Sequence, residues 1–164
     1  MMSALFPKLS FSHDETPMSW AARQAAFHTG GRLGPFLNDL GIPILDLAKG
    51  KIGAVERLCT LAGQDPTKVL VNNITAIGKR RFRLRGEEFS SDFTTGSETR
   101  FCSMCLGEDI SGHGDPRIAM RHRLYWRIAP IRTCPLHFMP LHVVRGAKWN
   151  DAFHELQAMD QSIL

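Results

Sequence analysis

The chain has 164 residues, of which 43% are hydrophobic and 22% are charged, and its formal net charge is +4. This length suits one ordinary domain or two very small ones, and the hydrophobic content argues against a disordered chain. The apolar runs are too short to cross a bilayer and the N-terminus lacks a signal-peptide core, so we expect a cytoplasmic protein without membrane contact.

Residues 1–78 are predicted to form a helical N-terminal part, which begins with an extended arm over residues 1–13. Thr16 suits the N-cap of a helix, and Pro17 suits its first position, where no amide donor is needed. Apolar residues then recur at helical spacing until the Gly30–Gly31 pair, which favours a helix end. We therefore expect the first helix to begin at Pro17 and to end at these glycines.

Residues 52–74 have the outline of a helix-turn-helix. Before them, a short helix is expected to end at Gly41, and Asp46 is expected to cap the next segment. Within the hairpin, the Asp65–Pro66 pair is typical of the start of a second helix. Any two-helix hairpin gives a similar pattern, so insertion into DNA and simple αα packing both stay open.

From residue 79 the helical periodicity stops, and we place a boundary near residues 76–80 between the helical part and a second part, residues 79–148. Residues 81–85 alternate basic and apolar side chains, which predicts a strand. The second part has thirteen Lys and Arg against seven Asp and Glu, whereas residues 1–78 have seven against six. Such an excess suits a nucleic acid, an acidic protein surface or simple solvation.

The candidate contacts to a nucleic acid or a partner come from the hairpin and from this basic stretch. They are Lys68, Asn72, Lys79, Arg80, Arg81, Arg83 and Arg85.

Two more helices are expected. Residues 116–131 lie between the cysteine pairs and are predicted to be helical, and residues 149–164 are predicted to form an amphipathic C-terminal helix. The second of these places Trp149, Phe153, Leu156 and Met159 on one side. That side is expected either to close the core or to make a dimer.

Four residues have the spacing of a metal site: Cys102-x2-Cys105 and Cys134-x2-His137, with 28 residues between the pairs. A two-residue spacer lets both side chains of a pair reach one ion, and two pairs complete the tetrahedral shell that Zn²⁺ prefers. We expect one structural Zn²⁺ in a zinc-ribbon- or treble-clef-like part. Catalysis is not expected, because four protein ligands leave no open position and no His-x-Glu signature is present. Nearby arginines, such as Arg100 and Arg132, are expected to offset the charge of three thiolates.

Three stretches together resemble the TniQ family of transposition-associated proteins, which are related to TnsD. The first runs from Glu15-x-x-x-Ser19-Trp20 to Phe-Leu-x-x-Leu-Gly, which ends at Gly41. The second is Arg-x-Cys-x-x-Cys-Leu-x-Glu-Asp over residues 100–109, and the third contains Tyr-x-Arg and Cys-Pro-x-His between residues 125 and 137. The resemblance covers residues 6–142, and its implications for fold and function are expectations.

The resemblance implies a non-enzymatic adaptor that selects targets for DNA transposition. Its expected partners are an AAA+ ATPase of the TnsC type and, in guide-RNA-directed systems, a Cascade-type effector, with DNA contact also possible. It implies Cys102, Cys105, Cys134 and His137 as the zinc ligands. The overall expectation is a mainly α fold with a small β content and no small-molecule substrate. The alternative is a standalone helix-turn-helix DNA-binding regulator with a structural zinc site.

Overall fold

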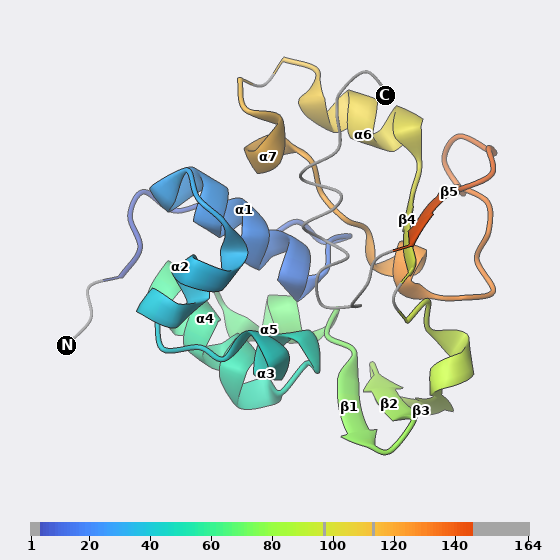
Figure 1. Ribbon diagram of the computed structural model, residues 1–164, viewed down its shortest axis with the longest axis horizontal. Helices are drawn as coiled ribbons and strands as arrows, with labels where there is room; N and C mark the ends of the chain where they lie inside the picture. Colours follow the sequence, from blue (N-terminus) through green and yellow to red (C-terminus); the bar gives the residue numbers. More distant parts are fainter. Residues whose placement is uncertain (1–3, 97, 113, 146–164) are drawn as a thin grey trace.

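The computed structural model describes residues 4–96, 98–112 and 114–145, and its helices gather on one side while its short strands gather on the other (Figure 1). The helical side is built from five helices. They are α1 (Pro17–Thr29), α2 (Leu33–Asp39), α3 (Ile44–Ala48), α4 (Ile52–Ala62) and α5 (Pro66–Leu70). Helix α7 (Pro116–Ala119) packs against α1, while α6 (Ser103–Ile110) and five strands lie on the other side (Figure 1), so the described chain is mixed α and β.

The first helix has the ends that its sequence predicts. The Thr16 side chain accepts a hydrogen bond from the backbone nitrogen of Ser19 at 3.2 Å, and Pro17 occupies the first turn. At the other end Gly30 has a φ of 66°, and its nitrogen donates to the carbonyl of Ala26. The predicted N-cap, first position and glycine stop of α1 are therefore confirmed.

The segment between α2 and α4 differs from the prediction for Asp46. This residue lies inside α3, because Pro43 is extended and is the N-cap of that helix, three residues before Asp46. The carboxylate of Asp46 instead pairs with Lys51 Nζ at 2.7 Å. Gly50 then lies against the carbonyl of Ile74, where an added Cβ would be 2.1 Å from the oxygen, so only glycine allows this close approach.

The hairpin of α4 and α5 exists, but its second helix is short. Gly63 ends α4 with a φ of 65°, and Asp65 caps α5 by accepting from the nitrogen of Thr67 at 3.0 Å. Helix α5 ends at Leu70, and a turn replaces the helical continuation to residue 74 that the sequence suggested. A five-residue helix offers about one turn to a DNA groove, so a DNA-reading helix-turn-helix is not established.

Two small antiparallel sheets form the other side. Strands β1 (Thr75–Gly78), β2 (Arg81–Leu84) and β3 (Glu87–Ser90) pair in sequence order, with Phe82 opposite Phe89. This confirms the strand predicted at residues 81–85. Strand β4 (Glu98–Phe101) pairs with β5 (His142–Arg145), which places Phe101 opposite His142.

The predicted helix over residues 116–131 is wrong for most of its length. Helix α7 ends at Ala119, the chain then runs extended, and a 3-10 turn covers Leu124–Arg127. The extended piece follows the chain that leads into α1: the nitrogen of Thr16 donates to the carbonyl of His122, and Leu124 donates to Asp14. These long-range backbone bonds replace helical bonds that the local sequence favours.

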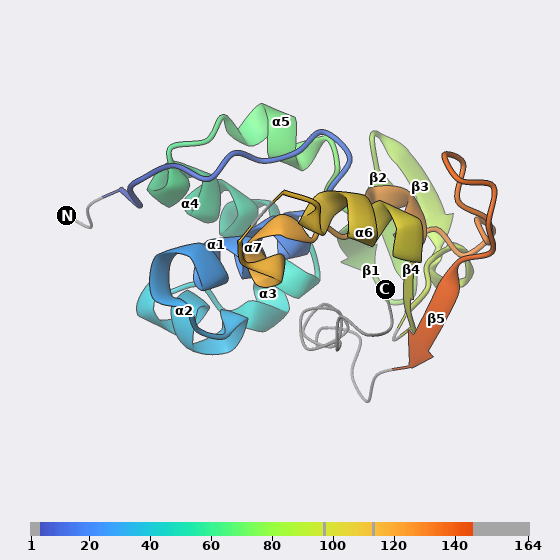
Figure 2. The same ribbon diagram turned by 90° about the horizontal axis from the view of Figure 1, so that it is seen from above.

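One hydrophobic core joins the two sides. Buried residues in continuous contact run from Trp20 on α1, through α2 and α4, to Phe101, Cys105 and Trp126. The N-terminal arm is docked as well, because Leu5 donates to the carbonyl of Leu61 at 2.6 Å, and the arm follows α4 in Figure 2. The predicted C-terminal helix, residues 149–164, lies outside the described residues.

Candidate metal centre

Three thiols and one imidazole converge between β4, α6 and the loop before β5. The ligand atoms of Cys102, Cys105, Cys134 and His137 all lie within 4.8 Å of one another. His137 Nδ1 is 3.5, 3.4 and 3.6 Å from the sulfurs of Cys102, Cys105 and Cys134, and the Sγ atoms of Cys105 and Cys134 are 3.6 Å apart. The four residues predicted from spacing therefore form one cluster.

The spacing of these atoms fits a tetrahedral zinc ion. Zn–S bonds of about 2.3 Å and Zn–N bonds of about 2.0–2.1 Å place tetrahedral ligands about 3.8 Å apart for two sulfurs and about 3.6 Å apart for sulfur and nitrogen. The observed separations of 3.6 Å and 3.4–3.6 Å are close to these values. The three cysteines are 0–1% exposed, so the cluster is closed to solvent on the sulfur side.

The sheet of β4 and β5 brings the two pairs together. Cys102 directly follows β4 and is the N-cap of α6, and its partner Cys105 lies in the first turn of that helix. Cys134 and His137 lie in a loop held by two backbone bonds: Cys134 donates to Met139 at 2.8 Å, and Phe138 donates to Cys134 at 2.9 Å. Phe138 takes a φ of 54°, which is uncommon for a bulky residue and shows how tightly this loop turns.

A carboxylate orients the histidine. His137 Nε2 lies 2.8 Å from Glu108 Oε1, while Nδ1 faces the sulfurs. With Nε2 donating to the carboxylate, Nδ1 keeps its lone pair for a metal, which is the usual support of a metal-ligating histidine. This hydrogen bond raises the pKa of His137. Sequence spacing did not reveal the role of Glu108, which follows from its place one turn after Cys105.

The electrostatics of the sulfurs also fit a cation. Burial raises the pKa of the Cys105 thiol to about 12, and its bond to Cys134 adds to the rise. Burial opposes the thiolate of Cys134 as well, but hydrogen bonds from the backbone amides of His137 and Leu136, together with those to the His137 ring and Cys105, lower its pKa to about 6. Neighbouring thiolates therefore oppose each other, and a divalent ion among them would remove that cost.

A third arginine, Arg123, lies next to the cluster in addition to those that the sequence suggested. Arg100 donates to the carbonyls of Ala129 and Ile131 at 2.7 and 3.1 Å, so its guanidinium braces the loop beyond the strand. Arg123 is the buried cation whose charge favours the thiolate of Cys105. Burial raises the pKa of Tyr125, and the charges of Cys105 and Cys134 raise it further, so its hydroxyl stays protonated.

Asp109 connects this centre to the rest of the molecule. It follows Glu108 on α6 and accepts from Arg123 Nη2 at 2.7 Å and from Arg121 Nη2 at 3.0 Å. Arg121 also reaches the arm, because its Nη1 lies 3.1 Å from Asp14 Oδ1. The second motif therefore ends in two acids with different contacts: Glu108 bonds His137, and Asp109 binds the arginine that reaches the arm.

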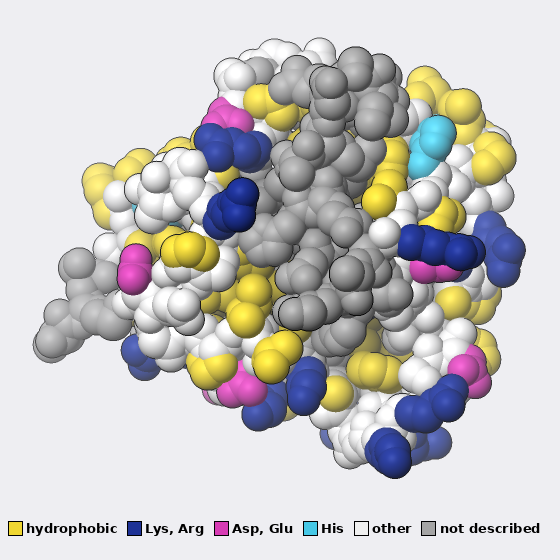
Figure 3. Space-filling model, in the orientation of Figure 1, with side chains coloured by type: hydrophobic (Ala, Val, Ile, Leu, Met, Phe, Trp, Pro, Cys, Tyr) yellow, Lys and Arg dark blue, Asp and Glu magenta, His cyan; other side chains and the backbone are white. Residues whose placement is uncertain are grey.

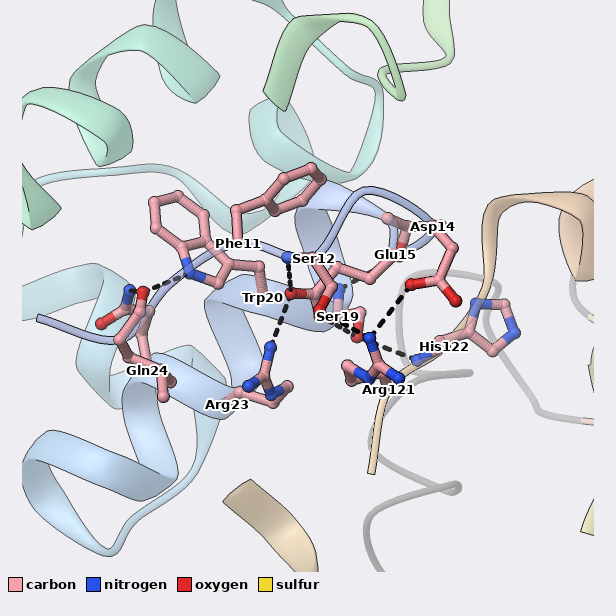
Figure 4. A network of polar contacts seen from close by, with 12 residues as sticks. Phe11, Ser12, Asp14, Glu15, Ser19, Trp20, Arg23, Gln24, Arg121 and His122 are labelled. Carbon is pink, nitrogen blue, oxygen red and sulfur yellow. Dashed lines mark hydrogen bonds and ion pairs between the residues drawn. The ribbon is translucent and has the colours of Figure 1, made fainter. Parts of the chain in front are cut away.

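The first motif is a buried polar network at the start of α1 (Figure 4). The carboxylate of Glu15, which is 0% exposed, accepts from Ser19 Oγ at 2.9 Å and from Arg23 Nη1 at 2.6 Å. Ser19 Oγ accepts from the nitrogen of His122 at 2.9 Å. Trp20 Nε1 donates to the carbonyl of Leu9 at 2.9 Å. The motif residues therefore hold the arm and the extended segment after α7 against α1.

The predicted nucleic-acid contacts fall into two groups. Lys68 is exposed on α5, and the arginines of residues 80–85 lie on the hairpin of β2 and its turns, where Figure 3 shows a basic group at the lower right. These arginines have acceptors. Arg81 and Arg83 pair with Glu88 at 3.4 and 2.6 Å, and Arg80 pairs with Asp92 at 3.2 Å. Exposed pairs of this kind are weak, so they leave the arginines able to exchange partners.

Asn72 lies in the interior, so it is not available for the surface contact that the sequence suggested. It is 1% exposed, and its amide donates to the carbonyls of His13 and Glu15 at 2.7 and 2.8 Å. Its Oδ1 accepts from Arg85 Nη2 at 3.0 Å, so Arg85 is partly committed to the same contact. Asn72 lies in the turn that follows α5, and not on a continuation of that helix as the sequence suggested.

Comparison with known proteins gives one match. A protein-family model described as TniQ matches residues 6–141. Neither a curated protein nor a solved structure matches the chain. Among the helices of the described residues, none is both long and apolar enough to span a membrane.

Proposed function

Because this chain belongs to the TniQ family, which is associated with transposition, we propose that it is a non-enzymatic adaptor in target selection. In this role it joins an AAA+ ATPase of the TnsC type to a target-recognition complex, which is a Cascade-type effector in guide-RNA-directed systems. The proposal concerns binding surfaces, because the described metal cluster has four protein ligands and leaves no position for a substrate.

The ion in this proposal is one structural Zn²⁺. Three thiolates and one imidazole are a set that zinc prefers, and the separations of the ligand atoms support it. When bound, the ion ties the loop before β5 to the start of α6. Its contribution is stability and shape in a region of short strands and small helices.

The observation that carries the adaptor proposal is the exposed apolar rim of the metal centre. We define this rim as Met104, Leu136 and Phe138, which are 48%, 64% and 82% exposed. Each lies within two residues of a ligand, so the metal would hold all three in place. Figure 3 shows hydrophobic side chains gathered at the upper right, over the start of α6 and the loop before β5. Rigid exposed apolar groups are typical of protein contact sites.

A binding assay with purified components tests the adaptor. The zinc-loaded chain should retain the TnsC-type ATPase in a pull-down, and Phe138→Ser with Leu136→Ser should reduce retention at least tenfold while the zinc content stays at one per chain. Leu45→Ser is the matched control, because Leu45 is 54% exposed on α3 and lies outside the rim. Equal retention by the double variant and the wild type would rule out the rim as the contact.

The alternative function is a standalone DNA-binding regulator. It is supported by Lys68, by Lys79 and by the basic hairpin, which we define as strands β2 and β3 with the arginines of residues 80–85. Such a protein should bind a defined duplex tightly on its own at physiological salt, with an affinity that falls steeply as salt rises. An adaptor should bind DNA weakly and the ATPase tightly. Fluorescence anisotropy over a salt series separates the two.

Native mass spectrometry tests the ion directly. We expect one zinc per folded, reduced chain. A folded chain without zinc after purification in zinc-containing buffer would refute the metal site, while the pull-down would still report on the adaptor.

A further inference from the structure

A groove of 330 Å³ lies where the helical side, the three-stranded sheet and the segment after α7 meet. Its wall is formed mainly by apolar side chains and backbone. Residues that line it include Met18, Ala48, Ile74, Phe82, Thr94 and Arg127. None of them belongs to the metal centre or to its rim, so the proposed adaptor function does not use this groove.

The groove is a built feature of the fold. Gly50 forms part of its wall and lies so close to the carbonyl of Ile74 that no side chain fits between them. Phe82 of β2, which lines the groove, stacks on Phe89 of β3 with ring centroids 6.2 Å apart. Among the described lining residues the ionisable side chains are His122 and Arg127, and none is acidic.

The chain leaves β5 beside this groove. Arg145, the last residue of β5, lies opposite Glu98 in the β4–β5 register. Gly96, which lines the groove, is two residues before Glu98. Trp149 is four residues after Arg145, and four extended residues reach about 13 Å. The residues from Trp149 onward therefore begin within reach of the groove.

The sequence of residues 149–164, here called the tail, is complementary to the groove. Trp149, Phe153, Leu156 and Met159 recur at helical spacing, so one side of a helix would be apolar. The tail carries three acidic residues and no Lys or Arg. An apolar groove with Arg127 in its wall suits a segment of this charge.

We propose that the tail binds this groove, with Trp149 and Phe153 inserted between α1 and the three-stranded sheet and with its acidic residues toward Arg127. The short connection favours the chain's own tail over a second copy, because it gives a high local concentration at the groove. Binding would hold the helical side and the sheet together at a wall that includes Asn72 and His122, next to the polar network of Glu15.

Tryptophan quenching by iodide tests this binding in the full chain. Trp20 and Trp126 are 0% exposed, so the tail's Trp149 is the accessible candidate, and a Trp149→Phe variant identifies its share of the emission. We expect Trp149 to be protected in the wild type. Met18→Glu places a negative charge in the groove and should increase its quenching severalfold, whereas the neutral Met18→Gln of similar size should change it little.

Several results would overturn the proposal. One is a wild-type Trp149 quenched as readily as the same residue in a free peptide of residues 149–164. Another is equal protection in Met18→Glu and Met18→Gln, and a third is protection that disappears on dilution, which would assign the groove to a second copy. Phe153→Ser changes the tail alone and provides the same test if Met18→Glu does not fold: protection that persists in it would also contradict tail binding.

Discussion

Nε2 of His137 lies 2.8 Å from Oε1 of Glu108, on the side of the ring opposite the three sulfurs. Two residues that are 29 positions apart thus decide which ring nitrogen is available to a metal. The carboxylate takes the proton-bearing nitrogen, and the other nitrogen points to Cys105 at 3.4 Å. The four candidate ligands therefore depend on a fifth residue, because Glu108 orients the ring of His137.

Loss of this support should weaken the metal site without removing a ligand. We expect Glu108→Ala to lower zinc affinity by about 10–100-fold, because the ring loses the partner that orients it. Competition with a chelator of known affinity measures the change. Glu87→Ala is the control, since Glu87 is an exposed acid on β3. Equal affinities in Glu108→Ala and the wild type would show that the loop alone orients the ring.

Removal of the charge at Asp109 should destabilise the whole fold. Asp109→Asn leaves Arg123, which is 4% exposed, with the longer contact to Asp14 at 3.4 Å in place of its two close bonds to Asp109, and breaking such a buried pair costs about 3–5 kcal/mol. Urea unfolding at saturating zinc gives the free energy of unfolding. Asp92→Asn removes an exposed acid from the pair with Arg80 and should have little effect. A loss below about 1 kcal/mol in Asp109→Asn would mean that water replaces the pair.

The basic hairpin provides a test of nucleic-acid contact. If Arg81 and Arg83 bind phosphates, the double change to alanine should lower the slope of log affinity against log salt by about 2. Glu88→Gln should strengthen binding, because Glu88 accepts from both arginines in the free chain. Anisotropy with one duplex at several salt concentrations measures both effects. An unchanged slope in the double variant would exclude the hairpin from DNA contact.

His122 should make stability depend on pH. Burial, together with the charge of Arg127, lowers its pKa to about 3 from an ordinary value of 6.5. The unfolded chain therefore binds a proton that the folded chain does not bind between these values. Stability from this group is complete above pH 6.5 and falls toward pH 3, by at most about 1.4 kcal/mol per pH unit.

A variant series separates this histidine from the other acid-sensitive groups. His122→Gln should flatten the decline of the free energy of unfolding between about pH 6 and 4, whereas His13→Gln, at an exposed position of the arm, should not. Urea midpoints at each pH give the curve. An identical pH dependence in His122→Gln and the wild type would contradict the assignment.

The four residues of the candidate metal cluster were predictable because their information is local. Two Cys-x2 pairs bring their own side chains together in pairs, and the residues at helix ends, such as Thr16, Gly30 and Asp65, act through bonds to their nearest neighbours. Strand β2 was predictable for the same reason, since its alternation is visible in four residues. Interactions that span a few residues can be read along the chain.

The predictions that were wrong concern residues whose partners lie far away in the sequence. Residues 120–123 have helical composition, yet they run extended because Thr16 and Asp14, more than a hundred positions earlier, take part in their backbone bonds. Asn72 was expected at a surface, but the carbonyls of His13 and Glu15 hold it inside. No periodicity within either segment records these contacts.

The sequence by itself determined the four residues of the candidate metal cluster, both ends of the first helix and the family, all of which depend on residue types at short, regular spacings. Only the tertiary structure decided that Glu108 orients His137, that Asp109 and Arg121 connect the candidate metal centre to the arm, and that Arg81 and Arg83 already have an acidic partner. The physical reason is that a buried charge or donor is stable only beside its partner, and the folded chain chooses that partner from distant segments.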